Sequence, residues 1–209
     1  MAVIRRRAQQ DPEKKLEYEG AVKRESQRRY SLDEYFAVEE TSQVKNEYYD
    51  GQIFAMAGAS LQHNRITANL LSFIAPALRD RGCEAFGSDF RIQTPGGLFT
   101  YPDLSVVRGA TLLIQARPDT LTNPIVLVEV FSDATREYDR GQKFTLYKEI
   151  PAFREYVLVE QEQVLVETFR WAASGSWEPR TCENLDAAIL LESVNVSIPL
   201  RDIYRLVFD

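Results

Sequence analysis

Ile125-Val126-Leu127-Val128-Glu129-Val130-Phe131 is an almost wholly apolar, largely β-branched stretch in a chain of 209 residues. Such a stretch is typical of a central strand that is covered on both faces in an α/β protein. Glu129 is its ionisable residue, and an isolated carboxylate in this setting carries a desolvation cost of several kcal/mol or becomes protonated. Glu129 therefore needs a cation, a metal ion or strong hydrogen-bond donors. The alternative is a glutamate at a strand end that faces water or forms a structural ion pair.

The segments on either side of this strand predict an α/β fold, with a mixed β-sheet flanked by helices and additional antiparallel hairpins. Ser31-Leu32-Asp33-Glu34 has the form of a capping box that opens a helix over residues 32–39. Asp50-Gly51 predicts the turn of a hairpin over residues 47–54. The other predicted elements are a helix between Ser60 and Gly82, strands at 83–86, 90–94 and 99–107, a turn-rich connector at 117–124, a helix at 139–150, a hairpin of 155–160 with 164–171, strands at 177–182 and 194–198, and a short helix at 199–204.

Charge is spread unevenly along the chain. The chain carries 25 Lys+Arg against 31 Asp+Glu, a net charge of −6, yet residues 1–29 alone carry a net charge of +4. Residues 1–29 are polar and lack apolar periodicity, so we predict a basic, flexible arm there and a single domain over residues 30–209. The acidic remainder argues against broad electrostatic binding of nucleic acid.

The cysteine count and the apolar runs indicate a cytoplasmic protein. Cys83 and Cys182 are the two cysteines, which excludes a disulfide framework and a Cys-rich zinc site. Reduced thiols are the simplest interpretation. The basic residues 1–7 are not followed by the apolar run of a signal peptide, and the longest apolar runs fall short of the roughly 20 residues that a membrane helix needs. We therefore expect no membrane association.

A second carboxylate, that of Asp103, favours a functional role for Glu129. Asp103 follows Pro102 and opens another apolar strand, so neighbouring strands could place Asp103 and Glu129 side by side. Two like charges at one point repel each other, and a hard divalent cation is their natural partner. Mg²⁺ suits such a site because one or two carboxylates hold it while water and a substrate phosphate complete the shell. The alternative is that Asp103 is a turn residue that caps the strand entrance.

A third candidate is a lysine on the helix predicted after this strand. Lys143 lies four residues after Asp139 and four before Tyr147, so the three share a helix face. A lysine beside paired carboxylates can position water or stabilise negative charge on a phosphate. The alternatives are a solvated lysine paired to Asp139 and, for Tyr147, an aromatic that only packs.

These residues, in this order, resemble the PD-(D/E)xK nuclease superfamily and, more specifically, the Uma-two family of restriction endonucleases. The resemblance covers about residues 30–170. It rests on six stretches, namely Tyr30-Ser-Leu-Asp-Glu-Tyr35, Glu47-Tyr-Tyr-Asp-Gly-Gln-Ile53, His63-Asn64, Tyr101-Pro-Asp-Leu-Ser-Val-Val107, Val128-Glu-Val-Phe-Ser132 and Tyr138-Asp-Arg-Gly-Gln-Lys-Phe-Thr-Leu-Tyr147. The resemblance implies a restriction-endonuclease-like core and metal-dependent hydrolysis of phosphodiester bonds.

The resemblance also implies roles for individual residues. Asp103 and Glu129 would bind the metal, Lys143 would be catalytic, and Glu47 would be an acidic residue supplied from an early element. The superfamily lysine usually stands two residues after the second acid, where this chain has Phe131, so Lys143 must reach the site from the following helix. His63 would neighbour the metal or orient water; its alternative role is that of a core hydrogen-bonding residue.

We therefore expect a nuclease-like domain over residues 30–209 that acts as a Mg²⁺-dependent endonuclease on DNA, with Mn²⁺ able to substitute. A homodimer is expected because cleavage of a duplex needs two cuts and two-fold pairing is common. The rival hypothesis is a non-catalytic, nuclease-like scaffold that binds nucleic acid or protein, because a fold alone does not guarantee activity. A third is a phosphodiesterase acting on RNA or a nucleotide. No helix-turn-helix, zinc finger or other sequence-specific reader is evident.

Overall fold

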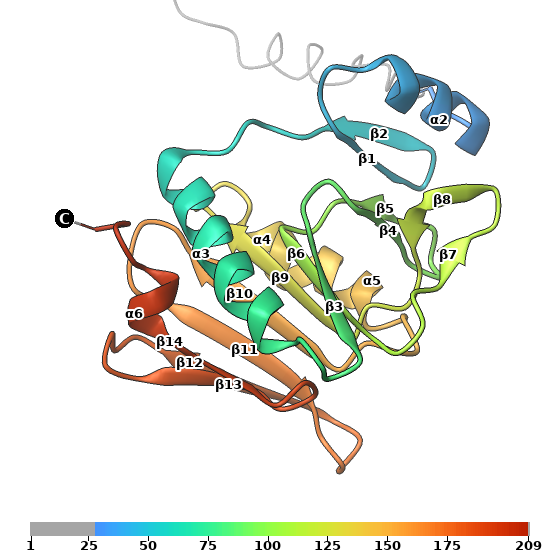
Figure 1. The fold of residues 1–209 in the computed structure, drawn as a ribbon. Helices are drawn as coiled ribbons and strands as arrows, with labels where there is room; N and C mark the ends of the chain where they lie inside the picture. The colour runs from blue at the N-terminus through green and yellow to red at the C-terminus, as the bar shows by residue number, and fades with distance from the viewer. Residues whose placement is uncertain (1–27, 209) are drawn as a thin grey trace, which may run out of the picture.

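A central six-stranded sheet organises the fold. The computed structural model describes residues 28–208, so the predicted arm lies outside the described residues except for Arg28 and Arg29. The strand order is β12-β11-β10-β9-β6-β3, and β9 and β10 form its parallel pair while its other pairs are antiparallel (Figure 1). Its strands are β3 (Cys83–Gly87), β6 (Leu104–Arg108), β9 (Val126–Phe131), β10 (Glu155–Glu160), β11 (Val166–Trp171) and β12 (Trp177–Cys182).

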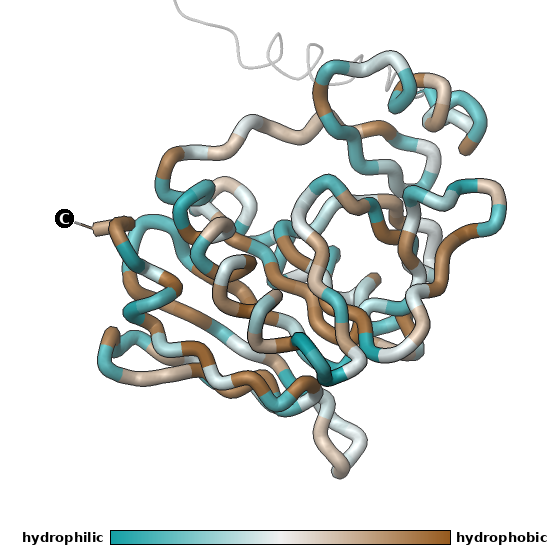
Figure 2. Tube along the Cα trace, viewed as in Figure 1, coloured by the Kyte–Doolittle hydropathy of each residue, from teal (hydrophilic) through white to brown (hydrophobic). Residues whose placement is uncertain are grey.

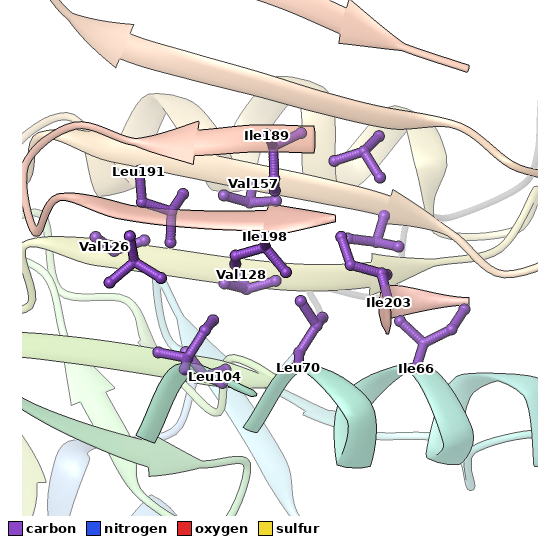
Figure 3. Packing of buried hydrophobic residues seen from close by; sticks show 14 of the residues in the cluster. Ile66, Leu70, Leu104, Val126, Val128, Val157, Ile189, Leu191, Ile198 and Ile203 are labelled. Carbon is purple, nitrogen blue, oxygen red and sulfur yellow. The ribbon is translucent and has the colours of Figure 1, made fainter. Parts of the chain in front are cut away.

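The central strand β9 is buried along its whole length, as its sequence predicts. Because side chains alternate across a strand, Val126, Val128 and Val130 point to one face of the sheet, where they join a large apolar cluster. This face is covered by α3 (Leu61–Ala77), α6 (Leu200–Ile203) and the hairpin of β13 (Ala188–Leu191) with β14 (Val196–Pro199), as Figure 3 shows from close by. The periodic apolar residues of α3, Ile66, Leu70 and Ile74, supply the helix side of this core.

The opposite face of β9 meets a second apolar cluster, to which it contributes Leu127 and Phe131. Three consecutive helical segments cover this face: α4 (Arg136–Tyr138), the π-helical η1 (Asp139–Lys143) and α5 (Phe144–Tyr147). In Figure 2 the hydrophobic colour concentrates along the strands in the middle of the molecule, between the two coverings. Within residues 28–208, no helix combines the length and the apolar character needed to cross a bilayer.

A second six-stranded sheet, ordered β2-β1-β5-β4-β8-β7, lies beside the first. Its strands are β1 (Asn46–Tyr49), β2 (Gln52–Ala55), β4 (Arg91–Gln93), β5 (Phe99–Thr100), β7 (Leu113–Ile114) and β8 (Arg117–Leu121). A small aromatic core of Tyr35, Phe36 and Phe99 joins this sheet to α2 (Leu32–Thr41). The two sheets and the helices on them make the mixed α/β fold that the sequence predicts.

The predicted caps and turns form as expected. Ser31 and Glu34 make a reciprocal capping box, in which the Ser31 hydroxyl accepts from the Glu34 amide (3.2 Å) and the Glu34 carboxylate accepts from the Ser31 amide (2.8 Å). Ser60 caps α3 by accepting from the His63 amide at 3.0 Å. The hairpin of β1 and β2 turns through Asp50 and Gly51, whose positive φ angles of 47° and 77° are those a two-residue hairpin turn requires.

The structure corrects one predicted strand and one predicted connector. The strand expected over residues 99–107 is two strands in different sheets, β5 and β6, because Pro102 lacks the amide proton that would continue one ladder. Residues 117–124, expected as a connector, contain β8, which pairs in parallel with β4. Its apolar end, Thr120 and Leu121, is buried despite the turn-like residues before it.

The helix boundaries also differ from the prediction. The helix expected over residues 139–150 begins at Arg136, changes to π-helical geometry at Asp139 and ends at Tyr147. The helix expected to run to Gly82 ends at Ala77, one residue after Pro76, and Gly82 has a positive φ in the turn that leads into β3.

A buried arginine ties α2 to the second sheet. Arg91 is 2% exposed, and its guanidinium donates to Thr120 at 2.9 Å and pairs with Glu39 at 3.4 Å and Asp119 at 2.8 Å. Tyr101 accepts from Arg91 at 3.2 Å and donates to Glu39. We call these five residues the Arg91 cluster.

Candidate active site

Strand alternation places Glu129 on the face of β9 that the helical segments cover. Glu129 shares this face with Leu127 and Phe131 and is 5% exposed. It therefore lies inside the molecule and not at a wetted strand end. The strand that buries it also fixes the direction of its carboxylate.

Lys143 points from η1 to the carboxylate of Glu129. The Lys143 Nζ lies 3.0 Å from Glu129 Oε1, 3.2 Å from Glu47 Oε1 and 3.5 Å from Asp139 Oδ1. All four side chains are at least nine-tenths buried. We call these four residues the Lys143 cluster. The segment after the strand thus folds back over it, which is the condition under which Lys143 can stand in for a lysine at position 131.

Glu47 comes from the other sheet. It lies on β1, and Thr100 of β5 and Tyr138 of α4 both donate to its carboxylate, the latter at 3.0 Å. Glu47 therefore connects three elements that are far apart in the sequence. Glu47, the acidic residue that the family resemblance implies in an early element, is thus in direct contact with Lys143.

Asp103 directly precedes β6 and lies beside Glu129. Leu104 pairs with Val128 in the antiparallel ladder, so the next position on each strand sets Asp103 opposite Glu129. The Asp103 carboxylate accepts from the Val130 amide at 2.7 Å, which anchors it to β9. His63, in the first turn of α3, places its Nε2 3.1 Å from the Asp103 carboxylate. His63 thus contacts the predicted metal ligand and is half-buried.

Three further residues belong to the site. Tyr147 donates to Glu129 at 2.6 Å, so it does more than pack. Asp139 contacts Lys143, as helix spacing suggests, and its backbone carbonyl accepts from Tyr156 at 3.1 Å. Tyr138, which sequence reasoning did not single out, holds Glu47 and lies with its ring 5.7 Å from the Lys143 Nζ. Its position directly before Asp139, within the stretch 138–147 that carries the family resemblance, was the available signal.

The site carries more negative than positive charge, and the pKa values of its groups reflect this. Burial raises the pKa of Glu129 to about 8, with the Asp139 and Asp103 carboxylates adding to the shift and Lys143 opposing it. Burial raises the pKa of Asp139 as well. Burial opposes the charge of Lys143, but Glu129, Glu47 and Asp139 outweigh it and hold its pKa well above the ordinary value. Lys143 is therefore a permanent cation at neutral pH.

Glu47 behaves differently from Glu129 although both contact the same ammonium group. Burial opposes its ionisation, but Lys143 and the donated hydrogen bonds of Thr100 and Tyr138 lower its pKa below the ordinary value. Glu47 is therefore the ionised partner of Lys143. Glu129 is the carboxylate whose charge the site leaves insufficiently compensated.

The donor set of Asp103 and Glu129 fits a hard divalent cation. Both offer carboxylate oxygens from adjacent strand positions, and Mg²⁺ is commonly held by one or two carboxylates with water and phosphate in the other places. Within residues 28–208, no group of three or more His, Cys, Asp or Glu is arranged to hold a metal ion. A closed, all-protein cage is therefore not built here, and the fit is to a metal that keeps open positions.

Comparison with known proteins places this chain among nuclease-like sequences. A sequence model named Uma2 and described as "Putative restriction endonuclease" matches residues 32–201. Two proteins of Synechocystis sp. (strain PCC 6803), both described as uncharacterized, are similar to it: one is 35% identical over 84% of this chain and 91% of its own length, the other 34% identical over 69% and 82%.

A solved structure has the same fold. The crystal structure described as "a putative nuclease belonging to DUF820" from Anabaena variabilis ATCC 29413 superposes with a TM-score of 0.69. The match covers 85% of this chain and 99% of that chain at 18% identity. This likeness shows that the two proteins share a fold.

Proposed function

The chain belongs to the Uma2 family of restriction endonucleases, and from that premise we propose that it is a metal-dependent endonuclease that hydrolyses phosphodiester bonds in DNA. The observation that carries this proposal is the Lys143 cluster with Asp103 beside it. One ammonium group faces three buried carboxylates, and a fourth carboxylate lies opposite Glu129. Buried charge that is left uncompensated is costly, so such an arrangement favours a further cation.

Each residue has a role that follows from its contacts. Asp103 and Glu129 would hold Mg²⁺, or Mn²⁺ in its place, and a metal bound there polarises the phosphate and lowers the pKa of an attacking water. Lys143, whose Nζ lies 3.0 Å from Glu129 Oε1, would supply a fixed positive charge that orients water or stabilises negative charge on the phosphate. Glu47 and Asp139 position Lys143, and Tyr147 fixes the direction of the Glu129 carboxylate.

The acidic character of the chain is compatible with DNA as substrate. The carboxylates at the site repel phosphate until a divalent cation balances them, so productive binding of DNA depends on the metal. A homodimer would supply the second cut that a duplex needs. A cytoplasmic location agrees with Cys83 and Cys182, which are both free thiols.

Nicking of supercoiled plasmid in Mg²⁺ or Mn²⁺ tests the proposal. We expect Glu129→Gln to abolish metal-dependent nicking, because it removes a metal ligand but keeps the size of the side chain. Asp119→Asn is the matched control: it neutralises a carboxylate that also pairs with a buried cation but is 61% exposed and belongs to the Arg91 cluster. Full activity of Glu129→Gln would remove the basis of the proposal.

Calorimetric titration with Mn²⁺ separates this proposal from a non-catalytic scaffold. Binding by the wild type and its loss in Glu129→Gln are expected. A folded wild-type protein that binds no Mn²⁺ would favour the scaffold. Comparison of plasmid DNA with an RNA substrate in the same assay separates a deoxyribonuclease from a phosphodiesterase that acts on RNA.

A further inference from the structure

A pocket of about 490 Å³ opens directly beside the Lys143 cluster. Its lining includes Glu47, whose carboxylate contacts Lys143, and Tyr138, which donates to Glu47. The pocket is within the size range of small-molecule sites in proteins. A group held in it would therefore lie next to the residues that we propose to act on the scissile phosphate.

The β1–β2 hairpin supplies one wall of this pocket through its strand alternation. Glu47 pairs with Phe54, and Tyr49 pairs with Gln52, so these four side chains share one face of the hairpin, and all four line the pocket. The other face carries Tyr48 and Ile53, which pack against the aromatic core beneath α2. The hairpin thus has one structural face and one face turned to the pocket.

Phe54 is the unusual residue on the pocket face. It is 48% exposed, although its cross-strand partner Glu47 is buried, so a flat apolar ring stands at the pocket beside a charged site. Tyr49, half-buried against the second apolar cluster, adds a second ring to the pocket lining. Exposed aromatic rings that flank a nucleic-acid site commonly stack on bases, and such stacking tolerates any base because every base has a π-face.

The polar lining argues against a phosphate in this pocket. Its charged lining residues are Glu47 and Asp50, and no Lys or Arg lines it in the described part of the chain. Gln142 of η1 contributes an amide, which can both donate to and accept from the edge of a base. Arg29, whose side chain is 70% exposed, pairs with the lining residue Asp50 at 2.7 Å, so a cation stands beside the pocket but not in its lining.

We propose that this pocket, formed by Phe54, Tyr49 and Gln142 beside Glu47, binds one unpaired nucleobase of the substrate strand. This rests on the proposed function and specifies its substrate: a single strand, or a duplex with one nucleotide turned out of the stack. Turning a base out is cheapest at mismatched, damaged or already single-stranded positions. The protein would therefore select a structure in the nucleic acid and not a base sequence.

The test uses a probe without phosphate, so that its outcome depends on neither metal nor hydrolysis. The probe is 2-aminopurine riboside, whose fluorescence is quenched when it stacks on an aromatic ring, titrated with the full chain in EDTA. We expect saturable quenching by the wild type and by Phe54→Tyr, which keeps the ring. Phe54→Ala is expected to weaken binding on the order of 5-fold or more.

Trp171→Ala is the matched control, because Trp171 is an aromatic of similar exposure (41%) on β11, outside the pocket lining. Its quenching should equal that of the wild type. Equal quenching by wild type and Phe54→Ala, or none by the wild type, would overturn the base pocket and leave the nuclease proposal standing. Quenching that depends on Phe54 in a protein that cleaves no DNA would support the pocket even where the proposed hydrolysis fails.

An exposed Phe54 could instead contact a second copy of the chain. Light scattering, which measures the mass of the protein in solution, tests this alternative. We expect the wild type and Phe54→Ala to have the same mass. A dimer that Phe54→Ala converts to a monomer would assign Phe54 to an interface between copies and overturn the base pocket.

Discussion

The Arg91 cluster and the Lys143 cluster are two buried cations surrounded by acids, and they differ in charge balance. Arg91 faces Glu39 and Asp119, of which Asp119 is 61% exposed, so water shares in stabilising its charge. Lys143 faces Glu47, Glu129 and Asp139, which are all buried. A buried cation alone therefore does not distinguish the candidate active site from a structural cluster. The excess of buried carboxylates over buried cations is what sets the Lys143 cluster apart.

The two clusters also use their donors differently. The planar guanidinium of Arg91 places its donors on Thr120, Tyr101 and the two carboxylates, and Tyr101 in turn donates to Glu39. This closed arrangement suits a structural role. The Lys143 cluster concentrates its acids on one ammonium group and leaves Glu129 with a pKa of about 8. Perturbed pKa values of this kind are common at functional sites.

The largest expected effect is on stability, in the Arg91 cluster. Arg91→Met leaves Glu39 buried without its cation and should lower the free energy of unfolding by about 3–5 kcal/mol. Urea denaturation followed by circular dichroism measures the loss. Asp119→Asn, which alters the exposed partner, should cost less than about 1 kcal/mol. A loss as small for Arg91→Met as for Asp119→Asn would contradict the structural role of this cluster.

The pH dependence of stability should come from the other cluster. In metal-free protein, Glu129 with its pKa of about 8 keeps a proton that the unfolded chain releases near pH 4.5. Its contribution is therefore complete below about pH 4.5 and is lost as the pH rises toward 8. Lys143 is protonated in both states, and above about pH 5 Glu47 is ionised in the folded protein and largely ionised in the unfolded chain, so both add little slope. Asp139, whose pKa burial also raises, adds a slope of the same sign as Glu129, and comparison with Glu129→Gln separates the two.

We expect the free energy of unfolding in EDTA to fall by roughly 2–3 kcal/mol between pH 5 and pH 7.5 relative to Glu129→Gln. Urea denaturation at a series of pH values gives both curves. Saturating Mn²⁺ should remove the slope in the wild type. Parallel curves for wild type and Glu129→Gln would show that Glu129 does not titrate in this window.

Neutralising one acid in each cluster should give opposite results at pH 7.5 without metal. Glu39→Gln weakens an acceptor shared by Arg91, Tyr101 and Asn46 and should cost about 1–2 kcal/mol. Glu129→Gln resembles the protonated form that the site already favours, so by the same titration it should stabilise the metal-free protein by roughly 2–3 kcal/mol at pH 7.5. Thermal denaturation of the two variants compares them directly. A large loss in Glu129→Gln would mean that its charge is balanced in the metal-free protein.

The smallest effect is expected from removing one hydroxyl from each cluster. Tyr147→Phe deletes the hydrogen bond to Glu129 and should change stability by about 1 kcal/mol or less. Because this bond favours the ionised carboxylate, its loss should move the titration of Glu129 to higher pH. Tyr101→Phe serves as the counterpart and should leave the pH dependence unchanged. A shift of the pH profile in Tyr101→Phe would indicate that the two clusters are coupled.

The central strand and the caps could be predicted from sequence because their signals are local. The apolar run around Glu129, the Ser31–Glu34 capping box and the Asp50-Gly51 turn each act through neighbouring residues, and each forms in the structure. The contact of Lys143 with Glu129 and Glu47 was accessible through helix spacing combined with the family resemblance. The assigned metal-binding and catalytic roles stay predictions.

The elements and contacts that were not predicted depend on packing between segments far apart in the sequence, which a single sequence does not show. The change to π-helical geometry at Asp139 and the pairing of β8 with β4 have no local signal that outweighs an ordinary helix or a loop. Tyr138 looks like any helix aromatic until the second sheet brings Glu47 to its hydroxyl. The Arg91 cluster joins residues from four separate segments, so its members resemble ordinary surface charges in the sequence.

The turn at Asp50 and Gly51 has a consequence beyond its own geometry. A slip of one position between β1 and β2 would exchange the two faces of the hairpin, sending Glu47 toward the aromatic core and Tyr48 toward Lys143. A side chain at Gly51 is disfavoured by the positive φ of 77° and because its Cβ would lie 3.0 Å from the Cβ of Arg29, which would have to shift. An insertion or substitution in this surface loop would therefore displace Glu47 from Lys143 and alter the proposed catalytic site without replacing any of its residues.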